Sequence, residues 1–167
     1  MPQPEKQIFF DEDLCLGCHA CEVACKAEHN LPPGVSRARI LTDGPALVNE
    51  KLELKYRRVA CRHCADAPCV KACPTDALHQ KADGIVYVEE GLCSGCRSCA
   101  AVCPADAIDF HPETYVAQLC DLCLHRLKKG ELPFCLKHCM GAALFFGTEQ
   151  EFKDYRRTYK AQGVGHD

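Results

Sequence analysis

Residues 93–104 read CSGCRSCAAVCP, and the spacing of these cysteines decides what the chain folds around. Cys93, Cys96 and Cys99 recur every three residues in a short loop that contains glycine. A fourth cysteine, Cys103, follows four residues later and precedes a proline. Three close thiolates can wrap one corner of an iron–sulfur cube, while the fourth cysteine of such a run ligates a neighbouring cube. We therefore expect cluster binding here, ahead of zinc and of disulfides.

The motif repeats along the chain, which has 167 residues and 16 cysteines. LCLGC at residues 14–18 reappears as LCSGC at 92–96, and CPTDAL at 73–78 reappears as CPADAI at 103–108. A weaker third copy, CMGAAL, occupies residues 139–144. All the cysteines fall into four quartets, which are Cys15, Cys18, Cys21 and Cys25; Cys61, Cys64, Cys69 and Cys73; Cys93, Cys96, Cys99 and Cys103; and Cys120, Cys123, Cys135 and Cys139. This complete division predicts four clusters.

The composition argues against a secreted, a membrane-spanning and a nucleic-acid-binding protein. Dense cysteine in a secreted chain would indicate disulfides, but residues 1–7 are polar and lack the charged and apolar regions of a signal peptide. We therefore expect a cytoplasmic protein whose thiols are free for metal, and no membrane span, because no apolar run approaches 18 residues. The net charge of −3, made more negative by clusters, argues against nucleic acid as a partner. The pairs Arg57–Arg58 and Arg156–Arg157 are expected on a solvated face, rather than in partner docking or in raising cluster potentials.

Local patterns predict short elements between the quartets. The expected strands are residues 8–10, 37–42, 51–60, 77–80, 85–88, 107–110 and 142–146, with a break at TDGP, residues 42–45. The expected helices are residues 18–28 and 149–160, and a helical turn or two is expected within residues 121–129. Lys26 replaces the usual proline after Cys25, so the first helix can continue toward His29. In the last helix, Phe152, Tyr155 and Tyr159 recur on one face that should pack on the body, and residues 163–167 should be frayed.

No catalytic residue is expected from the remaining chemistry. The sequence has no GxGxxG motif or P-loop, and no nucleophile–base constellation can be argued. The acidic runs at residues 11–13 and 89–90 are expected to be solvated caps. A polar or packing role is expected for six histidines, namely His19, His63, His79, His111, His125 and His138.

Four stretches carry a resemblance to a known family: CRHCADAPCVKACP at residues 61–74, DGIV at 83–86, CDLC at 120–123 and ALFFG at 143–147. The chain resembles the four-cluster ferredoxin-like electron-transfer subunits of molybdenum- or tungsten-pterin oxidoreductases, including those of dimethyl sulfoxide reductase, formate dehydrogenase and tungsten aldehyde oxidoreductase type.

The resemblance implies an α+β fold that duplicates the bacterial two-[4Fe-4S] ferredoxin, with short strands, short helices and inserted loops. The whole chain, residues 1–167, would form one compact body. Its parts would be one two-cluster repeat from residues 8–30 with 112–147, a second from 58–111, an inserted strand pair at 31–57 and a helical tail at 148–167.

The resemblance also implies how the quartets exchange cysteines, which spacing alone does not fix. One cube would be held by Cys15, Cys18, Cys21 and Cys139. A second would be held by Cys25, Cys120, Cys123 and Cys135. A third would be held by Cys61, Cys64, Cys69 and Cys103. The fourth would be held by Cys73, Cys93, Cys96 and Cys99.

The function so implied is a relay of electrons through four [4Fe-4S] clusters, without substrate chemistry, in anaerobic metabolism. The partner would be a large catalytic pterin subunit, with aldehyde oxidoreductase or formate dehydrogenase favoured. A flavin-, NAD- or quinone-linked subunit could join it, and copies could stack into a longer wire. One alternative is a free polyferredoxin that serves a hydrogenase or carbon monoxide dehydrogenase. Another is a zinc-binding interaction module.

Overall fold

The computed structural model describes residues 3–161, in which short helices and strands alternate with loops. Within these residues the strands form four separate antiparallel pairs: β1 (Gln7–Phe10) with β8 (Leu144–Gly147), β2 (Ala38–Val48) with β3 (Lys51–Ala60), β4 (Leu78–Gln80) with β5 (Val86–Val88), and β6 (Asp109–Phe110) with β7 (Ala117–Gln118). The helices are α1 (Ala20–His29), α2 (Pro68–Lys71), α3 (Ser98–Ala101), α4 (Leu124–Leu127), α5 (Phe134–Lys137) and α6 (Glu149–Ala161). The expected α+β class is confirmed.

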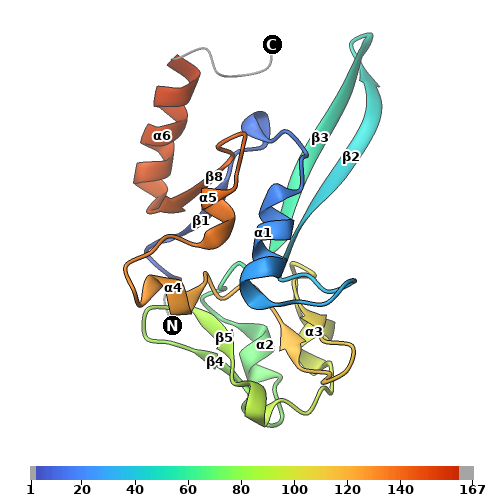
Figure 1. The fold of residues 1–167 in the computed structure, drawn as a ribbon, viewed down its shortest axis with the longest axis vertical. Coiled ribbons are helices and arrows are strands. Elements are labelled where there is room, and N and C mark those ends of the chain that lie inside the picture. Colours follow the sequence, from blue (N-terminus) through green and yellow to red (C-terminus); the bar gives the residue numbers. More distant parts are fainter. Residues whose placement is uncertain (1–2, 162–167) are drawn as a thin grey trace.

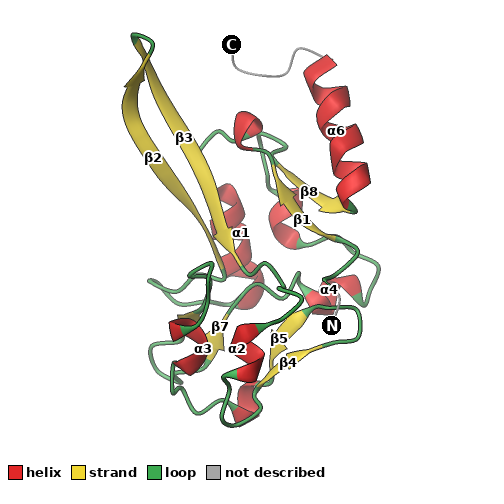
Figure 2. Ribbon diagram, turned by 180° about the vertical axis from the view of Figure 1, so that it is seen from behind, coloured by secondary structure: helices red, strands yellow, loops and turns green. Residues whose placement is uncertain are grey.

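The elements gather at two ends of an elongated molecule. In Figure 1, α2, α3 and the β4–β5 pair lie at one end, while β1, β8, α1, α5 and α6 lie at the other. Figure 2 shows the same division from behind, with the β2–β3 hairpin projecting well beyond the body. Because β1 pairs with β8, segments from both ends of the sequence build the same end of the molecule.

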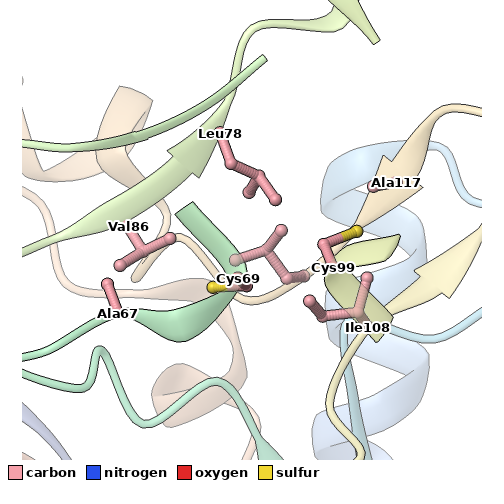
Figure 3. Packing of buried hydrophobic residues seen from close by; sticks show 8 residues of the cluster. Ala67, Cys69, Leu78, Val86, Cys99, Ile108 and Ala117 are labelled. Carbon is pink, nitrogen blue, oxygen red and sulfur yellow. The ribbon is translucent and has the colours of Figure 1, made fainter. Parts of the chain in front are cut away.

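The apolar core is small and includes cysteines. At the α2–α3 end, Leu78, Val86 and Ile108 pack with the buried Cys69 and Cys99. Figure 3 shows these side chains together, with the two sulfur atoms pointing away from each other. Cysteines thus take positions that aliphatic side chains occupy in an ordinary domain of this size.

Helix α1 follows the expectation for residues 18–28, shifted by one or two residues at each end. It runs through Lys26, whose N–H keeps the helix intact where proline would interrupt it. The helix ends at Asn30, which has a left-handed φ of 48°, and the N–H of Leu31 donates to the Lys26 carbonyl at 3.0 Å. The extra turn places His29 close to the loop after β7.

The β2–β3 hairpin turns at a different place from the one expected from the sequence. The break expected at residues 42–45 does not separate two strands, because β2 continues through it to Val48. The register shifts between Asp43 and Ala46, which marks a bulge where Pro45 has no ladder hydrogen bond to donate. The turn instead lies at Asn49 and Glu50, both with positive φ.

Helix α6 confirms the expected packing of the aromatic face. A capping box starts the helix: Thr148 Oγ1 accepts the N–H of Glu151 at 3.2 Å, and Glu151 Oε2 accepts the N–H of Thr148 at 2.7 Å. Phe152 stacks on Phe9 with ring centroids 4.9 Å apart, and Tyr155 lies 4.9 Å from the ring of Phe145. These contacts hold α6 against the β1–β8 pair.

Several short helices and strands of the structure are absent from the sequence-based prediction, and one predicted strand is longer than the observed one. The strand expected at 107–110 is only β6. The helical turn or two expected within residues 121–129 is confirmed by the four residues of α4. Strand β7 and helices α2, α3 and α5 were not predicted, because elements of two to four residues have no periodicity to read. The fraying expected for residues 163–167 lies outside the described residues.

The aromatic stack under α6 yields a prediction. Replacing Phe152, which is partly buried, with alanine should lower the local stability of α6 by about 2 kcal/mol, or roughly thirtyfold in amide exchange. Hydrogen exchange by mass spectrometry would measure it. The exposed neighbour Lys153→Ala is the matched control, and equal effects of both changes would show that the stack does not anchor the helix.

Candidate metal centres

Three hollows in the structure are each lined by four cysteines, three from one loop and one from a distant segment. The first, centre 1, is lined by Cys15, Cys18, Cys21 and Cys139. Centre 3 is lined by Cys61, Cys64, Cys69 and Cys103. Centre 4 is lined by Cys73, Cys93, Cys96 and Cys99. In each of these hollows the fourth cysteine thus comes from a different quartet than the other three.

The remaining four cysteines lie together as centre 2, deeper than the others. They are Cys25, Cys120, Cys123 and Cys135, and all are buried. Burial raises the pKa of Cys25, and the three other thiols of this set raise it further, which places them around it. Every described cysteine is free of disulfide bonds.

The donor sets fit iron–sulfur clusters. Each centre offers four thiols, which are soft ligands, and no carboxylate lines the three hollows. Backbone N–H groups also point at the sulfur atoms: that of His63 at Cys61 Sγ (3.4 Å), and that of Ala107 at Cys103 Sγ (3.5 Å). Such N–H···S bonds stabilise negative charge on sulfur and tune cluster potentials. The residues present could therefore hold four such clusters.

The cysteine-bearing loops share a left-handed backbone turn that orients their cysteines. In centres 1, 3 and 4, the residue two positions before the third loop cysteine has a left-handed φ: His19 at 56°, Ala67 at 31° and Arg97 at 66°. This turn starts the short helix that carries that cysteine. In the same loops Gly17 and Gly95 also have positive φ, and a Cβ there would fall within 2.7 Å of Tyr56 and Tyr115 respectively.

Burial affects the acidity of the thiols. It raises the pKa of Cys21 to about 11 and that of Cys135 to about 12, and it raises the pKa of Cys61 as well. Without metal these groups are neutral thiols at pH 7, because burial in a medium of low polarity disfavours the thiolate. Iron must therefore displace their protons to bind.

A polar network beside centre 2 was missed from sequence. Arg37 Nη1 donates to His29 Nδ1 at 2.9 Å and lies 3.4 Å from Asp121 Oδ2. Burial, and then Arg37, lower the pKa of His29 to about 4, so the ring is neutral. Since Nδ1 accepts from Arg37, the proton sits on Nε2, which lies 3.5 Å from Cys123 Sγ and donates toward it.

His29, Asp121 and Cys123 come within 4.8 Å of one another and could suggest a separate metal ion. The Arg37 guanidinium contacts both His29 and Asp121, and its charge would repel a cation there. The cluster of three groups is therefore better explained as support for centre 2.

The structure separates the two arginines that were expected on one solvated face. Arg57 is exposed and pairs with Asp43 at 3.2 Å, as expected. Arg58 is turned inward, with Nη2 4.0 Å from Cys120 Sγ, so the expectation is wrong for this residue. Alternation along β3 sends adjacent side chains to opposite faces, which the spacing of two arginines could have indicated.

The acidic run at residues 11–13 is also only partly as expected. Asp11 caps the turn after β1, accepting the N–H of Asp13 at 3.1 Å, but it is 2% exposed rather than solvated. Arg156 Nε lies 2.6 Å from its carboxylate. His63, 1% exposed, accepts the N–H of Val86 at 3.0 Å, which is a polar packing role.

Comparison with known proteins points to one family. Two models described as "4Fe-4S dicluster domain" match residues 52–149 and 14–78. The thiosulfate reductase electron transfer subunit PhsB of Salmonella typhi is 41% identical over 86% of this chain and 76% of its own length. The B subunit of polysulfide reductase from Wolinella succinogenes is 42% identical over 84% and 74%, and the B subunit of anaerobic dimethyl sulfoxide reductase from Haemophilus influenzae is 37% identical over 87% and 75%. Among the described residues no helix is long and apolar enough to cross a bilayer.

The raised thiol pKa values predict how pH controls iron retention. The pKa values of Cys21 and Cys135, about 11 and about 12, lie above the range from pH 6 to 9, so these thiols are protonated throughout it in the metal-free protein. The metal-free state thus binds protons that the loaded state lacks, and acid favours it. Anaerobic iron transfer to a chelator should increase at equilibrium by at least about tenfold per pH unit as pH falls. Iron retention independent of pH would contradict this account.

Proposed function

The chain belongs to the 4Fe-4S dicluster family, and from that membership we propose that it relays electrons to or from the catalytic molybdenum- or tungsten-pterin subunit of a reductase. It carries four [4Fe-4S] clusters and is the electron-transfer rather than the catalytic component of such a complex. The observation that carries the proposal is the set of four all-thiol centres in one body.

The contacts between centres support a row in the order 1, 2, 3, 4. Helix α1 carries Cys21 of centre 1 and Cys25 of centre 2. Cys61 of centre 3 packs against the small core that contains Cys120 of centre 2. Centres 3 and 4 share the core shown in Figure 3.

The two ends of this row meet the surface. Cys18 in centre 1 and Cys96 in centre 4 are exposed, whereas every cysteine of centre 2 is buried. Electrons could therefore enter at one end and leave at the other, with centre 2 between them shielded from water.

The protein's own residues would set how the relay works. A bound [4Fe-4S] cluster supplies a site that accepts and releases one electron. The cysteines exchanged between quartets tie neighbouring centres to shared segments and so fix their separation. Backbone N–H groups, His29 and nearby arginines adjust the charge felt at each centre.

We assign the cysteines to clusters as centres 1 to 4. In the same proposal the fold is a duplicated two-cluster ferredoxin. Centres 3 and 4 belong to residues 58–111, and centres 1 and 2 to residues 8–30 with 112–147. The β2–β3 hairpin and α6 are additions to that plan.

The partner is best proposed from the relatives. The three named above belong to thiosulfate, polysulfide and dimethyl sulfoxide reductases, so a reductase of this kind is the favoured partner. They give no support to the sequence-based preference for aldehyde oxidoreductase or formate dehydrogenase. A cytoplasmic location, a flavin-, NAD- or quinone-linked subunit and stacking of copies stay predictions, and native mass spectrometry of the purified complex would test the last two.

Two alternatives make different predictions. A free polyferredoxin would purify without a large subunit. A zinc module would be colourless, with about one zinc per four cysteines.

Metal analysis tests the proposal directly. The anaerobically purified chain should contain about 16 iron and 16 sulfide and absorb near 400 nm, since each cube holds four of each. It should copurify with a large pterin-containing subunit. Zinc in place of iron, or about eight iron per chain, would contradict the four-cluster relay.

Cysteine exchange between quartets is testable by single substitutions. Cys139→Ser should perturb the same electron paramagnetic resonance signal as Cys18→Ser, because both thiols face centre 1. Cys123→Ser is the control, since it should perturb a different signal although Cys123 and Cys139 are in the same sequence quartet. If Cys139→Ser instead reproduced the spectrum of Cys123→Ser, the assignment of centres 1 and 2 would be wrong.

A further inference from the structure

Arg58 lies where two centres adjoin. Its guanidinium Nη2 is 4.0 Å from Cys120 Sγ of centre 2. In the hairpin register it pairs with Ile40, whose side chain lines the hollow of centre 1. The charge of Arg58 also acts on Cys21 of centre 1 and on Cys135 of centre 2. The residue thus faces thiols from both centres at once.

No carboxylate forms an ion pair with Arg58 in the described part of the chain. Ion pairs are found there for Arg37, Arg39, Arg57 and Arg126, but Arg58 has none. Its side chain is partly buried, and a guanidinium stays protonated at any pH the protein meets. A partly desolvated charge without a counterion is unfavourable, so an anionic neighbour is required. The thiolates of two loaded centres are the anions in reach.

We propose that Arg58 is the shared counter-charge of centres 1 and 2, and that it raises the reduction potentials of both. A positive charge stabilises the more negative, reduced state of a nearby centre more than the oxidised state. Centre 4 lies at the far end of the row, so the charge of Arg58 has little effect on its reduction potential. Arg58 is a positioning residue: it acts on electron distribution along the relay and touches no substrate.

The inference rests on the proposed function, because it needs clusters in centres 1 and 2. Iron content separates the two: if the wild-type chain lacks about 16 iron, the proposed function fails, whatever Arg58 does. If the chain holds its full iron content and the reduction potentials of centres 1 and 2 do not depend on Arg58, only this inference fails.

Redox titration of the purified, loaded chain, monitored by electron paramagnetic resonance, provides the test. Arg58→Gln should lower the reduced-to-oxidised ratio of centres 1 and 2 at a fixed ambient potential about tenfold, which equals about 59 mV for one electron. Arg58→Lys keeps the charge and should restore most of that ratio. The signal of centre 4 should not move, and it serves as an internal reference.

Arg57→Gln is the matched control, because it removes the same charge one residue away on the opposite face of β3, where Arg57 is exposed. Equal shifts from Arg57→Gln and Arg58→Gln, or no shift from Arg58→Gln in a chain with full iron, would overturn the proposal.

Loss of iron in the variant is also informative. If Arg58→Gln and Arg58→Met lose about half the iron, with the signals of centres 1 and 2 absent, while Arg58→Lys keeps it, the charge requirement is supported. If Arg58→Lys loses as much iron as the neutral variants, shape rather than charge is what matters and the proposal is wrong.

Discussion

Every centre is closed by a thiol from a distant segment, and the rest of the structure depends on this exchange. Cys139 completes a loop that starts more than a hundred residues earlier, and Cys103 completes the loop that begins at Cys61. The four strand pairs are not joined into a larger sheet, and the core is small. Metal–thiolate bonds therefore connect the segments that are distant in the sequence, as a continuous sheet or a large core does in other folds of this length.

The sequence predicted what the cysteines and the longer periodic segments determine. The four quartets are readable because neighbouring cysteines in them lie mostly three to five residues apart, and α1, α6 and the β4–β5 pair follow from ordinary patterns. The Gly-Pro pair at residues 44–45 predicts a break where the structure has a bulge, because Gly-Pro is typical of both. Helices α2, α3 and α5 are stabilised by the loops that carry cysteines rather than by their own helix propensity. A sequence of four residues has no pattern from which such a helix could be predicted.

Residues that support the centres were harder to find than the ligands. His29 gains its role only because α1 continues past Cys25 and Arg37 fixes its ring proton. Arg58 gains its role only because the hairpin register turns one of two adjacent arginines inward. Both depend on contacts between segments far apart in the sequence, which no local pattern encodes. Both residues lie beside thiols of centre 2, His29 next to Cys123 and Arg58 next to Cys120.

Exposure differs along the row in a way that bears on damage by air. Cys18 and Cys96 are exposed at the two outer centres, whereas all four cysteines of centre 2 are buried. Oxidants such as dioxygen and superoxide would thus encounter the terminal centres first. Oxidative breakdown should start at centres 1 and 4, so that the cluster of centre 2 survives longest but can no longer exchange electrons with a partner. A docked partner at either end would then act as a shield as well as an electron source.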